Sequence, residues 1–272
     1  MLLEKYTEID GIKIFDDQVI SESDYNPTGL DNLYQAEEKH FWFLARKEFI
    51  LSKVKKYVSK TAKVMEVGAG TGNVTRYFKQ HGYSNLSVGE MHLGGLKYAQ
   101  NYGIHECYKF NILQNPFKDE FDAVCMFDVL EHIEEDNLTI KNVHVMLKNK
   151  GYMVLTVPAH RWLWNREDKI AGHKRRYTKK ELITKLKNNN FEIIEARYFF
   201  MTIVPLLFLR VFLSKDNDTM VSEEEHEKSI TMNPLLNQIL LFFSRIENKI
   251  NSFVPNVFGG SLFIIARKND TI

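Results

Sequence analysis

Cysteine, charge of one sign and long hydrophobic runs are all scarce in this chain of 272 residues. Its two cysteines, Cys107 and Cys125, lack metal-ligand spacing, which excludes a disulfide framework or a cysteine zinc site and indicates a reducing compartment. The 36 basic and 35 acidic residues give a formal net charge of +1. No overall field therefore draws the molecule to nucleic acid, and we expect no nucleic-acid partner.

One mainly apolar stretch, residues 199–213, is interrupted by Pro205 and Arg210. It is also shorter than the roughly 20 residues that a membrane-spanning helix needs. The first residues lack the apolar core of a secretory signal. The sequence thus predicts a cytoplasmic protein without a transmembrane helix, and leaves open a buried or membrane-surface element at 199–213.

What the chain does contain is an alternation of strand-like and helix-like segments. Apolar, β-branched runs predict strands at 63–67, 86–89, 108–112, 123–127, 152–157, 191–198 and 261–266. Helical periodicity predicts helices at 30–57, 73–80, 93–100, 137–147, from a capping box at Thr178, and at 235–250. Strands separated by helices are typical of a parallel sheet covered on both faces. We therefore predict the α/β class, with a doubly wound, mostly parallel sheet of seven strands.

Four parts follow along the chain. Residues 1–58 form an N-terminal segment, irregular to about residue 28, with a helical cap, and residues 59–200 form a cofactor-binding α/β core. Residues 201–260 form a helical insertion, and residues 261–272 the last strand of the core and a tail. Because helix 235–250 is amphipathic, the insertion could be a lid over the acceptor, a homodimer interface or a membrane surface.

Three glycines, Gly68, Gly70 and Gly72, lie between a predicted strand and a predicted helix. Glycine lets the chain turn sharply and lets a ligand approach the backbone, and ligands of such sheets bind at the carboxyl ends of strands. A dinucleotide fingerprint is G-x-G-x-x-G, but here the third glycine comes one position early and Asn73 stands where that fingerprint needs glycine. Glu90 ends the next strand, where an acid bonds ribose hydroxyls. The pattern favours a ribose without a pyrophosphate.

Residues 64–75 resemble motif I of class I S-adenosylmethionine-dependent methyltransferases, in which an acidic residue precedes alternating glycines. Asp128-Val129-Leu130-Glu131-His132 resembles the D-V-L-E-H segment of the ubiquinone-biosynthesis-like small-molecule methyltransferases. The resemblance covers about residues 60–200, flanked by H-F-W-F-x-x-R and G-H-x-x-R-Y. It implies a Rossmann-like enzyme that binds S-adenosylmethionine, releases S-adenosylhomocysteine and methylates a small-molecule or lipid-linked acceptor. It also implies that the last strand is inserted antiparallel.

The resemblance further implies roles for single residues. Glu66 would neighbour the methionine amino group, Glu90 would bind the ribose diol and Met91 would pack on adenine. Asn111 stands where aspartate is commoner, but its amide oxygen can still accept a bond from the adenine amino group. The predicted donor-binding set is Arg46, Glu66, Gly68, Ala69, Gly70, Thr71, Gly72, Glu90, Met91, Asn111, Ile112, Phe127 and Asp128.

Two members of this set concern the methionine end of the donor. Asp128 would line it by the same resemblance. Arg46 would bind the methionine carboxylate, because a guanidinium matches a carboxylate bidentately. The alternative for Arg46 is a solvated arginine on the surface of a helix.

Methyl transfer from a sulfonium depends on alignment, and it needs a base only if the acceptor must lose a proton. Four histidines are candidates, of which His132, His160 and His173 form the predicted catalytic set and His40 is the fourth. Glu131 and His132, with or without Asp128, are similar to the metal-binding acid–histidine group of some quinone-pathway enzymes. Two or three candidate ligands in one segment do not make a site, so we predict no metal.

Two other functions stay open at this point. One is an NAD(P)-binding oxidoreductase, against which Asn73 argues. The other is a non-catalytic, cofactor-binding or membrane-associated partner protein, which the apolar character of residues 199–250 suggests through peripheral membrane contact.

Overall fold

A computed structural model describes residue 2 and residues 5–15, 27–213 and 232–269. Part of the predicted insertion, residues 214–231, therefore lies outside the described residues. The strands are β1 Thr7–Ile9, β2 Ile12–Ile14, β3 Val64–Val67, β4 Leu86–Glu90, β5 Glu106–Lys109, β6 Phe121–Phe127, β7 Leu147–Pro158, β8 Phe191–Phe199 and β9 Ser261–Lys268. The α-helices are α1 Pro27–Glu37, α2 Phe41–Val54, α3 Asn73–Gln80, α4 Leu93–Asn101, α5 Asp136–Met146, α6 Arg166–Ile170, α7 Lys179–Asn188, α8 Val204–Leu213 and α10 Pro234–Ile250.

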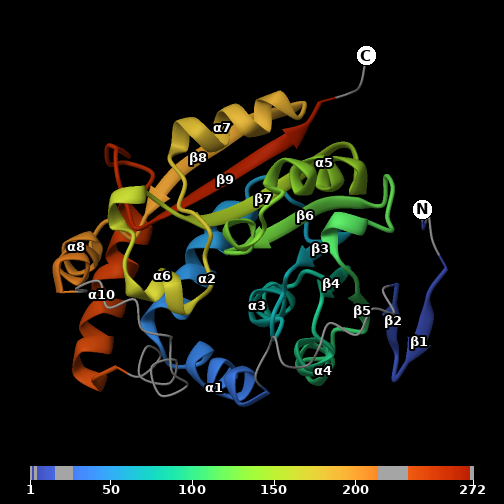
Figure 1. Cartoon of the computed structure of the whole chain (residues 1–272), viewed down its shortest axis with the longest axis horizontal. Helices are drawn as coiled ribbons and strands as arrows, with labels where there is room; N and C mark the ends of the chain where they lie inside the picture. Colours follow the sequence, from blue (N-terminus) through green and yellow to red (C-terminus); the bar gives the residue numbers. More distant parts are fainter. Residues whose placement is uncertain (1, 3–4, 16–26, 214–231, 270–272) are drawn as a thin grey trace.

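The strands form one twisted sheet in the order β1-β2-β5-β4-β3-β6-β7-β9-β8 (Figure 1). The strands from β5 to β7 in this order are parallel, and β9 runs antiparallel between β7 and β8. The predicted α/β fold and its inserted antiparallel strand are confirmed.

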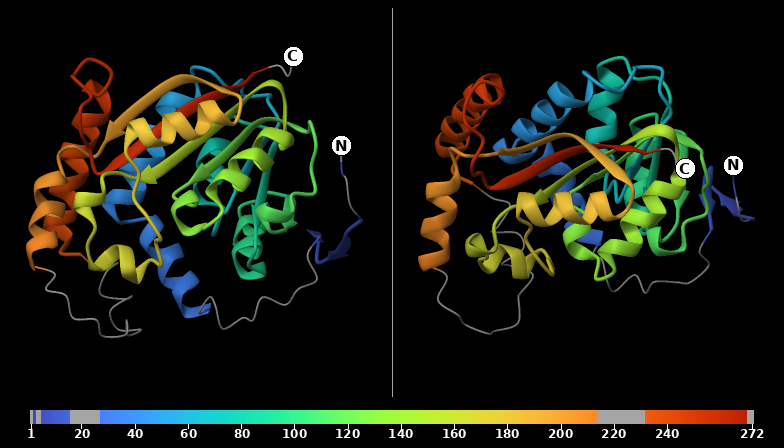
Figure 2. Two further views of the ribbon diagram at one scale, coloured as in Figure 1. Left: turned by 45° about the horizontal axis from the view of Figure 1, so that its top comes forward. Right: turned by 90° about the horizontal axis from the view of Figure 1, so that it is seen from above.

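Helices cover both faces of this sheet, as the alternation of side chains in β6 requires. Val124 and Met126 belong to a core cluster shared with α5 and α7, whereas Cys125 and Phe127 belong to a cluster shared with α2 and α3. Figure 2 shows these two layers on opposite sides of the sheet. The sheet is therefore doubly wound, as predicted.

The predicted number of seven strands is wrong, because the hairpin β1–β2 extends the sheet to nine. Residues 1–28 were expected to be irregular, yet β2 pairs in parallel with β5. Ile12 and Ile14 are buried there in a small cluster with Leu96 of α4. Strands of three residues are too short to show alternation, and the Asp10-Gly11 turn was the available signal.

The predicted helix 30–57 is in fact two helices. His40 begins α2 as its N-cap, with its ring Nδ1 accepting a hydrogen bond from the Trp42 N–H at 3.3 Å. The insertion helix α10 lies along α2, where Asn248 donates to the carbonyl of Ala45 at 2.9 Å and Arg245 pairs with Glu48. None of the helices in the described residues is long and apolar enough to cross a membrane.

Candidate functional site

The glycine loop lies where β3 and β4 end side by side. Val67 pairs with Gly89 in the parallel register, and the Gly68 N–H donates to the Gly89 carbonyl at 2.8 Å. Beyond this pair of residues, the Gly70 N–H donates to the Glu90 carboxylate at 2.9 Å. The structure therefore brings the predicted ribose acid against the predicted loop.

Two of the loop glycines differ in what surrounds them. Both Gly68 and Gly70 have positive φ, of +68° and +55°. A Cβ on Gly68 would lie 2.6 Å from Cγ2 of Val129, whereas a Cβ on Gly70 would meet no atom of the described residues within 4 Å. Packing requires glycine at Gly68, while Gly70 borders the open space in which a ligand can approach the backbone.

Beneath the loop, two buried carboxylates accept hydrogen bonds from a backbone N–H and from hydroxyl groups. Glu66 accepts hydrogen bonds from the Thr75 N–H at 2.9 Å and from the Thr75 hydroxyl. Glu37 accepts a hydrogen bond from the hydroxyl of Thr71, a member of the predicted donor-binding set. Burial raises the pKa of both carboxyl groups to about 7. Two acids with such pKa values, one on β3 and one at the end of α1, beside the same loop are typical of a functional site.

Sequence reasoning missed Glu37 and also Lys47. Lys47 is buried, and its Nζ lies 3.1 Å from Oδ1 of Asn73 at the start of α3. Neither residue carries a motif of its own. The sequence showed each of them only as a polar side chain within the predicted helix 30–57. Their burial depends on contact with the distant glycine loop and the start of α3.

The methionine-end candidates Arg46 and Asp128 form a partly buried ion pair. Arg46 is only 8% exposed and lies over the Trp42 ring, 4.3 Å from its centroid. The alternative of a solvated helix arginine is therefore wrong. Asp128 has a φ of +57°, which is costly for a residue with a Cβ and is a feature of functional sites.

At the predicted adenine end, the side chains are held by local backbone bonds. Asn111 is the N-cap of the short 3-10 helix η2, Ile112–Gln114. Its Oδ1 accepts a hydrogen bond from the Leu113 N–H at 2.9 Å. The Glu90 carboxylate accepts another from the Met91 N–H at 2.7 Å. Ile112 is buried at this edge, and so is Phe127 at the end of β6.

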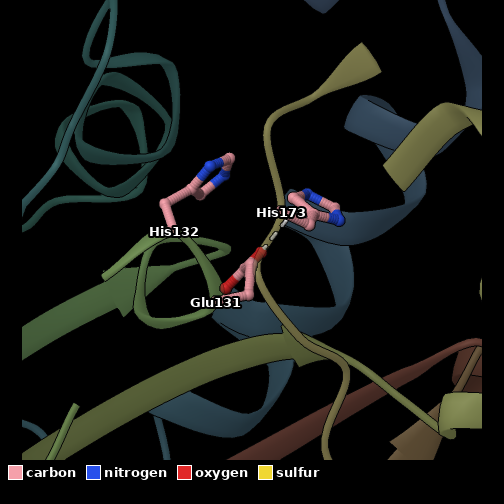
Figure 3. Close-up of side chains that lie close together, drawn as sticks. All are labelled: Glu131, His132 and His173. Atoms are coloured by element: carbon pink, nitrogen blue, oxygen red, sulfur yellow. Dashed lines mark ion pairs between the residues drawn. The ribbon is translucent and has the colours of Figure 1, made fainter. Parts of the chain in front are cut away.

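The structure gathers two of the four candidate histidines. His132 ends the 3-10 helix η3, Leu130–His132, and its ring packs edge-on against that of His173, with centroids 4.8 Å apart (Figure 3). His160 lies elsewhere, stacked on Tyr198 with centroids 4.7 Å apart, and His40 caps α2. The predicted set of His132, His160 and His173 is thus divided between two neighbourhoods.

The chain matches a family model described as a methyltransferase domain over residues 34–196, more than half of its length. This chain belongs to the methyltransferase domain family. Together with the class I fold, this makes the protein an S-adenosylmethionine-dependent methyltransferase. The match includes the glycine loop and the D-V-L-E-H segment, while membership of the ubiquinone-biosynthesis-like group stays a prediction. No curated protein matches this sequence.

Solved structures share the fold at low identity. A chain from the complex between the Haloferax volcanii Trm112 methyltransferase activator and a protein described as a methyltransferase is 12% identical, with a TM-score of 0.61 and coverage of 92% of this chain and 98% of that one. An S-adenosylmethionine-dependent methyltransferase from Mesorhizobium loti is 15% identical, with a TM-score of 0.53 and coverage of 80% and 96%. The [4+2]-cyclase SpnF is 14% identical, with a TM-score of 0.54 and coverage of 83% and 81%. Such likeness shows the fold alone.

Two loop substitutions test the different surroundings of the glycines. We expect Gly68→Ala and Gly70→Ala each to lose about 1–2 kcal/mol from the left-handed backbone, and Gly68→Ala to lose about 1–3 kcal/mol more because its methyl group meets Val129. Urea unfolding of the two variants measures the difference. Equal losses would contradict the packing role of Gly68.

Proposed function

We propose that this methyltransferase transfers a methyl group from S-adenosylmethionine to a small-molecule or lipid-linked acceptor, with the donor lying across the glycine loop. The observation that carries the proposal is the contact between Glu90 and Gly70. The Glu90 carboxylate lies 2.9 Å from the loop amide, and Gly70 borders open space. A ribose placed there would meet the acid through its hydroxyl groups and the loop through its ring.

The methionine part of the donor would lie toward β3 and β6. Its ammonium group would be attracted by Glu66, which is buried beneath the loop. Its carboxylate would meet Arg46, whose Nε has no hydrogen-bond partner among the described residues. A guanidinium keeps donors for a second carboxylate while it pairs with Asp128.

The nicotinamide alternative is disfavoured by the position of Asn73. This residue is 3% exposed, and its side chain pairs with Lys47 at the start of α3. In a dinucleotide site this third position is glycine so that the helix can pack closely on the strand, and here the Asn73 side chain occupies that space. The family assignment also favours a methyl donor over a dinucleotide.

An apolar or lipid-linked acceptor is supported by the helices of the insertion. Trp162 of the 3-10 helix η4, Arg161–Leu163, packs against Phe208 of α8, with ring centroids 6.0 Å apart. The exposed apolar residues of α10 are Leu235, Leu236, Ile239, Phe242, Phe243, Ile246 and Ile250. A patch of this kind marks an interaction surface. We propose peripheral contact with lipid as its use.

Vesicle flotation tests the lipid contact. We expect wild-type protein to float with phospholipid vesicles, and Ile239→Lys to weaken the partition by on the order of tenfold because it replaces an exposed isoleucine that would enter the lipid with a charged side chain. Ile9→Lys is the matched control, since Ile9 is also exposed but lies in β1 at the other edge of the sheet (Figure 1). If the wild-type protein does not bind the vesicles, the proposed lipid contact of α10 is wrong.

Donor binding is tested by calorimetry on Glu90 variants. We expect Glu90→Ala to weaken binding of S-adenosylhomocysteine by more than about tenfold, because both the diol contact and the Gly70 contact are lost. Glu90→Gln keeps an acceptor for the Gly70 N–H, so the loop should keep its conformation. Its affinity for S-adenosylhomocysteine should still fall about tenfold, because the contact between the carboxylate and the ribose diol is lost. Glu192→Ala, exposed on β8, is the control. No binding by folded wild-type protein would refute the proposed function.

Binding of S-adenosylmethionine should release a proton from Glu66. The pKa of this carboxyl is about 7 because it is buried, and a cationic donor favours its ionised form. Affinity should therefore fall as the pH falls through about 7. At about pH 6.5, where an α-amino group stays protonated, we expect release of about 0.8 proton per chain.

The proton count comes from titrations in two buffers with different ionisation enthalpies. Glu66→Gln should abolish the release, while its amide oxygen can keep the hydrogen bond from the Thr75 N–H. A release of zero in the wild type, or an unchanged release in the variant, would show that Glu66 does not face the ammonium group.

A further inference from the structure

We propose that Glu37 is a positioning residue for the methyl donor, because it holds Thr71 and through it the glycine loop in the conformation that receives the donor. This role rests on the proposed function, in which the donor lies across the loop. Helix α1, which ends at Glu37, thereby becomes part of the donor site, although the methyltransferase motifs of the sequence lie outside it.

Glu37 differs from its neighbours in α1 by its burial. It is 5% exposed, whereas Asp31 and Gln35 are exposed and Tyr34 is half-buried. A carboxyl group that leaves water loses its hydration, and a hydrogen bond within the protein offsets part of this cost. The Thr71 hydroxyl donates such a bond to Glu37, and Thr71 is itself 0% exposed. Removal of either side chain would therefore leave the other buried without this bond.

The contact lies next to the loop residue that borders open space. Thr71 follows Gly70, whose N–H donates to the Glu90 carboxylate at 2.9 Å. It precedes Gly72, whose N–H donates to the carbonyl of Ala69 at 2.8 Å. A Cβ on Gly70 would meet no atom of the described residues within 4 Å, so packing does not hold this part of the loop. Its conformation depends instead on hydrogen bonds, and the bond at Thr71 comes from a helix outside the sheet.

Helix α1 lies against the two helices that begin beside the loop, α3 and α4 (Figure 1). Tyr34 stacks on Tyr98 of α4, with ring centroids 4.6 Å apart. Glu38, which follows α1 directly, pairs with Arg76 of α3 at the surface. Glu37 is the one fully buried side chain among those of α1 that the structure describes. The docking of α1 and the conformation of the loop are therefore linked through the bond between Glu37 and Thr71.

This link has a consequence that a purely structural anchor lacks. An anchor would stabilise α1 and leave the affinity for the donor unchanged. A positioning contact couples two equilibria, and such coupling is reciprocal. If the docked α1 raises the affinity for the donor by a given factor, the bound donor must favour the docked α1 by the same factor.

The first half of this coupling is measured by calorimetry on the full-length protein with S-adenosylhomocysteine. We expect Glu37→Ala and Thr71→Val each to weaken binding by about tenfold, because each removes the bond that holds the loop. Glu37→Gln should stay within about threefold of the wild type, because its amide oxygen accepts the same bond. The double variant Glu37→Ala/Thr71→Val should bind no more weakly than either single variant, since both changes remove one contact.

Glu38→Ala is the matched control. It removes the neighbouring carboxylate, which is 42% exposed and pairs with Arg76 away from Thr71. We expect this variant to bind S-adenosylhomocysteine as the wild type does, because exposed ion pairs contribute little. Thermal unfolding establishes that each variant is folded, and Thr71→Val tests the contact independently if Glu37→Ala does not fold.

The second half of the coupling is measured by amide hydrogen exchange. Saturating S-adenosylhomocysteine should slow exchange in α1 of the wild type by about tenfold, the same factor as the loss of affinity in Glu37→Ala. In Glu37→Ala the ligand should leave exchange in α1 unchanged. Helix α7 is the internal reference, because it packs in the core cluster on the other face of the sheet.

Three results would overturn the role of Glu37 while the proposed function stands. They are wild-type affinity in both Glu37→Ala and Thr71→Val, additive losses in the double variant, and exchange in α1 that does not respond to the ligand in the wild type. A loss in Glu37→Gln as large as that in Glu37→Ala would also contradict the hydrogen-bond role. Failure of the folded wild type to bind S-adenosylhomocysteine would instead refute the proposed function itself.

Discussion

The parallel pairing of β3 with β4 and with β6 determines where the glycine loop, Glu90 and Asp128 lie. Strands that run in the same direction end at one edge, so segments far apart in the sequence meet there. The β3–β4 register brings the Gly70 amide to the Glu90 carboxylate. The β3–β6 register places Asp128 on the other side of the loop, and η3 follows directly with Glu131. The residues of the proposed donor site are thus brought together by these two strand registers.

A second feature of this edge is its buried charge. Glu37, Glu66 and Glu131 are all buried, and their pKa values are raised mainly by removal from water. The positive charge of Arg46 partly offsets this effect, because it lowers the pKa of each of the three carboxyl groups. Ionised carboxylates in such surroundings favour a cationic ligand, because the protein groups are already desolvated and need little reorganisation. A sulfonium donor with an ammonium group meets this requirement.

The helix α2 connects this edge with the insertion. One side of it supplies Arg46 and Lys47 to the site, and another side packs against α10 through Glu48 and Ala45. The insertion helix α10 and the proposed donor site are therefore joined through packing as well as through the chain.

Local patterns in the sequence were sufficient for the doubly wound sheet, the glycine loop and Glu90, because strand alternation and loop glycines are properties of neighbouring residues. The hairpin β1–β2, the break before α2 and the buried polar groups Glu37 and Lys47 were not predicted. Their structure depends on partners far away, such as Cys107 for Ile12 and Asn73 for Lys47. The approach of His173 to Glu131 likewise joins two segments about forty residues apart, with no local signal. Motifs report chemistry along the chain, and only tertiary packing decides which of those groups share a site.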